Sequence, residues 1–193
     1  MRHLEDLEQS RSQCANRLNE AKAHATVVDQ LRAQLALLDT HIAQTKQAIA
    51  DHIDQYPDLK RQRDLLTSIP GIGDLTAGKL LAEFRGITNF RNARQLVAFA
   101  GLNPRHHTSG SSIHKTTHIS KRGHPALRAA LYLPAVVAKQ HNPILAAFAE
   151  RLQARGVCGK ALIVALMRKL LHLAFGVLKS GRPFDPDFVP LHS

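Results

Sequence analysis

The sequence predicts an all-α protein with a long N-terminal helix and a compact helical domain. Through the first 56 residues, apolar side chains recur at helical spacing, and no later segment alternates at the period of a strand. Aromatic residues make up 5% of the chain and Trp is absent, so the core consists of Leu, Ala, Ile and Val, which favours helices. We expect an oligomerisation segment over 1–60, a helical domain over 61–181 and an irregular tail over 182–193.

Residues 1–56 contain no Gly or Pro, and Tyr56-Pro57 ends the helical pattern. The seam positions, spaced mostly three or four residues apart, are Leu4, Leu7, Cys14, Leu18, Ala21, Ala25, Val28, Leu31, Leu35, Leu38, Ile42, Ile49 and Ile53. Arg11 interrupts the seam. The pattern predicts one coiled-coil helix of about 80 Å that pairs with a second copy, giving a homo-oligomer, or with another helix. A hairpin bent near residues 26–30 is the open alternative.

Positive charge is concentrated in the second part of the chain. Residues 1–60 have seven Lys and Arg against nine Asp and Glu, whereas residues 61–193 have nineteen against six, a balance of +13. No acidic residue falls between Glu83 and Glu150. Because a surface of one sign attracts a polyanion and releases its counterions, DNA or RNA is the expected partner.

Other features exclude a membrane protein and a disulfide framework. No basic amphipathic helix with a bulky aromatic face is apparent, and the longest apolar run is broken by Arg168, Lys169 and His172. Cys14 and Cys158 lie far apart in sequence, which favours a reducing cytoplasm. We therefore expect a soluble cytoplasmic protein that is not exported.

The segment Ile69-Pro70-Gly71-Ile72-Gly73 lies between two apolar helical stretches and resembles a helix-hairpin-helix motif. Its glycines would let backbone N–H groups at a helix N-terminus approach a DNA phosphate. A plain helix–helix turn is the alternative, since such turns also favour Gly. The pattern Gly73-x4-Gly78-Lys79 matches most of a P-loop. Leu80 replaces the Ser or Thr that would bind Mg²⁺, so we do not expect nucleotide binding.

Four further helices follow in the domain. One spans 90–100 with Gly101 as its C-terminal cap, and one opens at His124-Pro125. Asn142-Pro143 starts a third, and a fourth runs from about 159 to 178.

Ser, Thr, His and basic residues gather between two of these helices, from Gly101 to Gly123. This mixture suits phosphate chemistry better than a core. The histidines at 106, 107, 114, 118 and 124 suggest zinc, but no cysteine accompanies them, so we expect basic loop residues and no metal site.

Several motifs in this region occur in one order: Gly101-Leu102-x-Pro104-Arg105, Ser109-Gly110, Ile119-Ser120-Lys121-Arg122-Gly123 and Leu127-Arg128. Over roughly 62–180, the chain resembles the C-terminal transposase domain of the DEDD-type insertion-sequence transposases. Members of this serine-using group are guided by a structured bridge RNA. The resemblance implies a DNA transposase or recombinase portion, with DNA and a guide RNA as partners.

The resemblance also implies that Ser109 is the nucleophile that forms a covalent phosphoserine link with DNA. Thr108, Ser111 and Ser112 are the neighbouring alternatives. A serine attacks a phosphodiester once its proton is removed and the phosphorane charge is neutralised, for which His107 and the nearby cations are candidates. The expected nucleic-acid-binding residues are Pro70, Gly71, Ile72, Gly73, Lys79, Arg105, Lys115, Lys121, Arg122 and Arg128.

The chain departs from the family because the N-terminal RuvC-like domain, whose four carboxylates hold Mg²⁺, is missing from this sequence. We expect no cofactor bound by this chain alone, and Mg²⁺ only together with such a domain. Two hypotheses follow: a transposase portion with a serine nucleophile, or a non-catalytic coiled-coil module that binds DNA or RNA.

Overall fold

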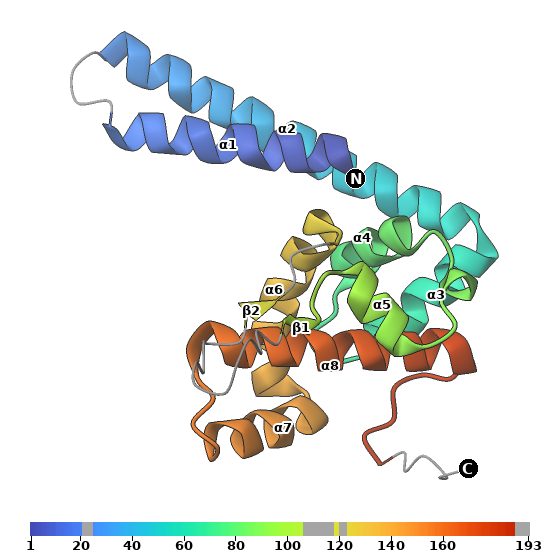
Figure 1. The fold of residues 1–193 in the computed structure, drawn as a ribbon. Coiled ribbons are helices and arrows are strands. Elements are labelled where there is room, and N and C mark those ends of the chain that lie inside the picture. The colour runs from blue at the N-terminus through green and yellow to red at the C-terminus, as the bar shows by residue number, and fades with distance from the viewer. Residues whose placement is uncertain (21–24, 106–117, 120–122, 188–193) are drawn as a thin grey trace. The chain divides into compact units, whose positions relative to one another are not determined.

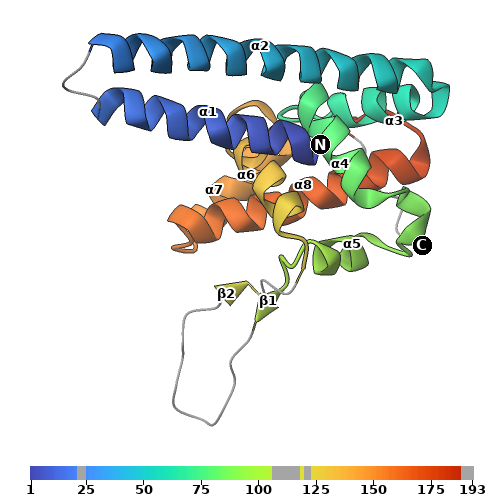
Figure 2. The same cartoon turned by 90° about the horizontal axis from the view of Figure 1, so that it is seen from above.

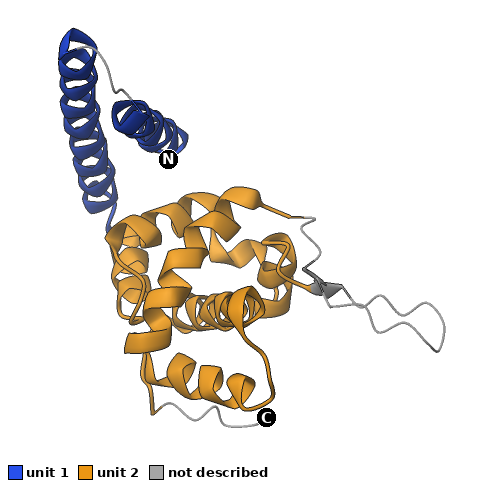
Figure 3. Cartoon of the chain, turned by 90° about the vertical axis from the view of Figure 1, so that its left-hand side faces the viewer, with its two compact units in different colours: residues 1–57 blue, residues 58–193 orange. Residues whose placement is uncertain are grey.

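The computed structural model describes residues 1–20, 25–105, 118–119 and 123–187. Within these ranges the chain forms eight α-helices, one 3-10 helix and one ladder of two-residue strands, so the all-α prediction is confirmed. Figure 3 shows two compact units, residues 1–57 and 58–193.

The first unit is a helical hairpin. Helices α1 (Arg2–Glu20) and α2 (Ala25–Gln55) lie side by side in Figures 1 and 2. Arg11 forms an ion pair with Asp39, yet the two residues would lie roughly 40 Å apart along one straight helix. The prediction of a single long helix is therefore wrong. The chain forms the hairpin of the alternative, but residues 26–30, where we placed the bend, lie within α2. Folding back lets the chain cover its own apolar seam.

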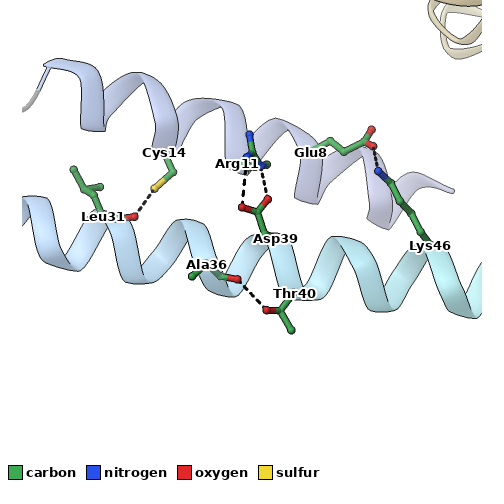
Figure 4. Close-up of polar contacts among 8 residues, drawn as sticks. All are labelled: Glu8, Arg11, Cys14, Leu31, Ala36, Asp39, Thr40 and Lys46. Atoms are coloured by element: carbon green, nitrogen blue, oxygen red, sulfur yellow. Dashed lines mark hydrogen bonds and ion pairs between the residues drawn. The ribbon is translucent and has the colours of Figure 1, made fainter.

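Polar contacts join the two helices of the hairpin (Figure 4). The Arg11 guanidinium donates to both carboxylate oxygens of Asp39, and this hydrogen bond lowers the pKa of Asp39. Lys46 Nζ lies 3.6 Å from Glu8 Oε1. Arg11, the polar interruption in the predicted seam, thus pairs with the opposite helix.

The second unit is a helical domain organised around α8 (Gly159–Ser180). Helices α5 (Ala93–Phe99), α6 (Pro125–His141) and α7 (Pro143–Gln153) pack against it, as does the 3-10 helix η1 (Ile87–Asn89). Helices α3 (Pro57–Thr67) and α4 (Asp74–Phe84) complete the unit, and α4 packs on α6.

By its length and composition alone, helix α8 is apolar enough to cross a membrane. Its side chains Leu166, Leu170 and Leu171 are fully buried within the hydrophobic core of the second unit. We therefore interpret α8 as the core helix of this domain.

The predicted helix boundaries follow from local chemistry. The Asn142 side chain accepts a hydrogen bond from Leu145 N, and Pro143 occupies the first turn of α7. Gly101 has a φ of 70°, and Leu102 N bonds to Val97 O, the pattern of a Schellman cap after α5. The helix after residue 90 begins at Ala93, slightly later than predicted, because Asn92 caps it.

Candidate nucleic-acid interface

The turn between α3 and α4 contains four of the predicted contact residues, Pro70 to Gly73. Ile72 is 4% exposed and belongs to the hydrophobic core, so any ligand contact it makes involves its backbone. Asn142 is fully buried, and its Nδ2 lies 3.5 Å from Pro70 O. One buried amide thus connects this turn to the junction of α6 and α7.

The two glycines of the turn have different surroundings. Gly71 has a φ of 104°, and an added Cβ would lie 2.6 Å from the Cβ of Ala138 on α6. Gly73 is exposed, has a φ of −93°, and an added Cβ would meet nothing within 4 Å. Close packing against α6 explains Gly71, whereas no contact among the described residues requires a glycine at 73.

Gly73 is the N-cap of α4, and no side-chain hydrogen bond caps this end. The first N–H groups of a helix have no partner within that helix, so they point outward beside Gly73. Asp74 follows in the first turn and would repel a phosphate, but its carboxylate lies 3.7 Å from Arg63 Nε. Lys79 is half-buried on the same helix.

A second predicted region begins where α5 ends and returns where α6 starts. Phe99–Gly101 and Gly123–His124 lie against each other, and we call this pair of segments the neck. His124 N donates to Phe99 O at 2.9 Å. A Cβ on Gly123 would stand 2.4 Å from Gly101 N and 2.5 Å from Phe99 O. The two backbones therefore touch at a distance that only glycine at 123 permits.

Side chains brace the neck. His124 Nε2 lies 3.1 Å from Glu83 Oε2 on α4, and its ring stacks on Phe99 with centroids 5.5 Å apart. His124 Nδ1 is buried without a hydrogen-bond partner among the described residues. Arg128 Nη1 donates to Ala100 O at 3.0 Å. Arg128, predicted as a nucleic-acid contact, thus has a structural role that its sequence position did not indicate.

Beyond the neck, the chain pairs as two short antiparallel strands, β1 (Pro104–Arg105) and β2 (His118–Ile119). Arg105 lies opposite His118. The sequence predicted no strand here, because two residues are too few to show alternation. The pairing and the neck bring both ends of the Ser109-containing region together.

Several predicted site residues lie outside the described residues, and the structure does not test them. These are His107, Thr108, Ser109, Ser111, Ser112, Lys115, Lys121 and Arg122. The side chain of Arg105 is likewise not described.

The sequence reasoning missed Glu83, Phe99 and Gly123. Gly123 carried a signal, since it ends the motif Ile119-Ser120-Lys121-Arg122-Gly123 and glycine is common where another backbone approaches closely. No sequence signal marked Glu83 or Phe99, because these residues contact His124 only after α4, α5 and α6 have packed.

Mg²⁺ is held by oxygen ligands, chiefly carboxylates. In the part of the chain that the structure describes, no three His, Cys, Asp or Glu side chains come together to hold a metal ion. The described residues therefore do not fit a metal centre.

Comparison with known proteins relates this region to transposases. Residues 63–150 match the family described as "Transposase IS116/IS110/IS902 family". The match spans the turn at 70–73, the neck and the region containing Ser109. It is somewhat shorter than the 62–180 over which the motifs indicated a resemblance.

Three individual relatives are similar to this chain. The chain is 40% identical over 145 residues to a pilin gene-inverting protein of Moraxella bovis, covering 75% of this chain and 45% of that protein. It is 29% identical over 146 residues to an uncharacterised 43.6 kDa protein of insertion element IS110 from Streptomyces coelicolor, covering 76% and 36%. A transposase for insertion sequence element IS1111A from Coxiella burnetii is 36% identical over 104 residues, covering 52% and 28%. The chain thus spans less than half the length of these relatives.

Proposed function

We propose that this chain is a portion of an insertion-sequence transposase of the IS110/IS116/IS902 type that binds DNA and takes part in strand exchange. The observation that carries the proposal is the family match over residues 63–150, which includes both predicted nucleic-acid regions. The excess of positive charge in residues 61–193 supports a polyanionic substrate.

Ser109 is proposed as the nucleophile. Its Oγ would form a bond to phosphorus while the bond from phosphorus to one sugar oxygen breaks, leaving a phosphoserine link and a free sugar hydroxyl. The serine proton goes to a base such as His107, and the departing oxygen takes up a proton. Arg105, Lys121 and Arg122 would neutralise charge on the phosphorane. The braced neck supports this role, since both ends of the region start from fixed positions.

The turn at 70–73 is proposed to hold DNA without reading its sequence, as in a helix-hairpin-helix motif. An exposed Gly73 and the uncapped N-terminus of α4 allow a phosphate oxygen to approach backbone N–H groups. Lys79 lies one to two turns further along the helix and adds positive charge.

Three partners complete the proposal. The hairpin of residues 1–57 would associate with a second copy, because Leu7, Leu18 and Leu35 are only half-buried by a two-helix layer. A carboxylate domain would provide the Mg²⁺ ligands that the described residues lack. A structured guide RNA is the third partner, which sequencing of RNA co-purified with the chain would reveal.

Covalent capture on DNA tests the function. The chain, a partner carboxylate domain and Mg²⁺ are incubated with a suicide DNA substrate whose cleaved end diffuses away. We expect a denaturation-resistant protein–DNA adduct that Ser109→Ala abolishes. Ser111→Ala and Ser112→Ala serve as matched controls and should retain it.

Two results would redirect the proposal. If Ser111→Ala abolishes the adduct and Ser109→Ala does not, the nucleophile is misassigned within the same mechanism. If no adduct forms in any combination while salt-sensitive DNA binding persists, the chain is a non-catalytic binding module.

A further inference from the structure

A groove lies along the C-terminal half of α8, and neither the turn at 70–73 nor the neck lines it. Its volume is about 880 Å³, and it is bounded by α8, the first turn of α7 and the segment that follows α8. The apolar residues that line it are Ile144, Leu173, Val177, Pro183 and Phe184. Phe184 N donates to Ser68 Oγ at 2.8 Å, so the segment after α8 is anchored to the end of α3.

Positive charge surrounds this apolar floor. The cations Lys169 and Arg182 line the groove together with the imidazole of His172. Among the described residues, no ion pair joins Lys169 or Arg182 to a carboxylate. Asp185 also lines the groove, and its Oδ1 accepts a hydrogen bond from Asp187 N at 2.9 Å. The cations therefore outnumber the acid.

The pKa of His172 agrees with an excess of positive potential. Burial, followed by the charges of Lys169 and Arg94, lowers the pKa of His172. An anion would relieve this imbalance, because opposite charge stabilises the protonated form.

We propose that this groove binds an unpaired nucleic-acid strand, with one phosphate at Lys169 and His172, another at Arg182, and a base over Leu173, Val177 and Phe184. An isolated phosphate would need only the cations, whereas a nucleotide also covers an apolar floor with its base. The proposal rests on the proposed function, which makes nucleic acid the substrate. It adds a second contact surface, formed by α8 and residues 182–184 and separate from the turn at 70–73 and the neck.

The test first removes three cations near Ser109 that would compete with the groove for the nucleic-acid probe. The full chain is prepared with Arg105→Gln, Lys121→Gln and Arg122→Gln, and its imidazole NMR signals are recorded with inorganic phosphate or a short oligothymidylate. The signal missing in His172→Gln identifies His172. We expect oligothymidylate to shift this signal and to raise the pKa of His172, with phosphate having the same effect at higher concentration.

Affinity measurements then localise the site. Lys169→Gln and Arg182→Gln should each weaken oligothymidylate binding by about fivefold, near the upper value for the loss of one exposed charge pair. Lys179→Gln is the matched control, because Lys179 is exposed on the last turn of α8 and does not line the groove. It should change affinity by less than about twofold.

Three results would overturn the proposal that this groove binds a nucleic-acid strand. The first is an unshifted His172 signal at saturating oligothymidylate. The second is an equal loss of affinity in Lys179→Gln, which would indicate diffuse charge. The third is an acidic peptide that shifts the His172 signal at a lower concentration than oligothymidylate does. Failure of the Ser109 adduct would overturn the proposed catalysis and leave these measurements unchanged, so the two failures are distinguishable.

Discussion

The hairpin of residues 1–57 and the unit of residues 58–193 are both helical but are stabilised differently. In the hairpin, few apolar side chains are buried, among them Cys14 and Ile42, and ion pairs join the two helices. In the second unit, α8 is surrounded by a continuous core, and backbones touch at Gly71 and Gly123.

The difference follows from the number of layers. Two helices can cover only one side of each other, so a seam residue such as Leu35 stays half-buried. A helix surrounded by others buries its apolar face fully, and close backbone approach then demands glycine. We therefore expect the second unit to be sensitive to a single added methyl group and the hairpin to tolerate more change.

The largest expected effect separates the two glycines of the 70–73 turn. Gly71→Ala should destabilise the second unit by about 2–5 kcal/mol, because left-handed backbone and overpacking against Ala138 both add cost. Gly73→Ala should cost less than about 1 kcal/mol, since the position is open. Denaturant unfolding measures both.

The same pair also tests the DNA-holding role. Gly73→Ala should weaken DNA binding while the chain stays folded, because its methyl group lies beside the N–H groups of α4. Unchanged binding in a folded Gly73→Ala chain would show that the turn serves only the fold.

Next in size is Gly123→Ala, which should cost about 1–3 kcal/mol by pushing the two backbones of the neck apart. Hydrogen exchange at His124 N–H, which bonds to Phe99 O, should become faster. Gly176→Ala is the control, since an added Cβ there meets nothing within 4 Å. An equally protected His124 amide in Gly123→Ala would contradict the braced neck.

A smaller effect is expected in the hairpin. Ile42→Ala, at a buried position of α2, should destabilise it by about 2 kcal/mol, near the lower limit for large-to-small changes. Leu37→Ala, at a position 55% exposed on the same helix, should stay within about 0.5 kcal/mol. Hydrogen-exchange rates of the α2 amides measure the loss of stability in both variants. Equal effects would mean that Leu37 is covered by another chain in solution.

The smallest expected effect concerns Arg11 and Asp39. The pKa of Asp39 is lowered in the folded chain, so its stabilising contribution is present above its unfolded pKa of about 3.9 and is lost as pH falls through the folded value. In Arg11→Gln, this pKa should return toward 3.9, as carboxyl NMR titration would show. Thermal stability should barely change, because both side chains are about half exposed. A pKa that stays low would assign the shift to another group.

Much of the fold could be predicted because caps and periodicity act locally. Asn142-Pro143 and Gly101 marked helix ends where the structure has them. The N-terminal helix was mispredicted for the same reason: a seam looks alike whether it meets a copy or its own chain, and no Gly or Pro marks the bend.

The amino-acid sequence by itself determined the helical class, the basic second part and the region containing Ser109, since these depend on composition, charge and short motifs. Only the tertiary structure decided that α1 folds back on α2, that Gly71 packs on Ala138 while Gly73 stays open, and that Glu83 reaches His124. These contacts join residues distant in the chain, and their partners are chosen when helices pack, a step that no local pattern encodes.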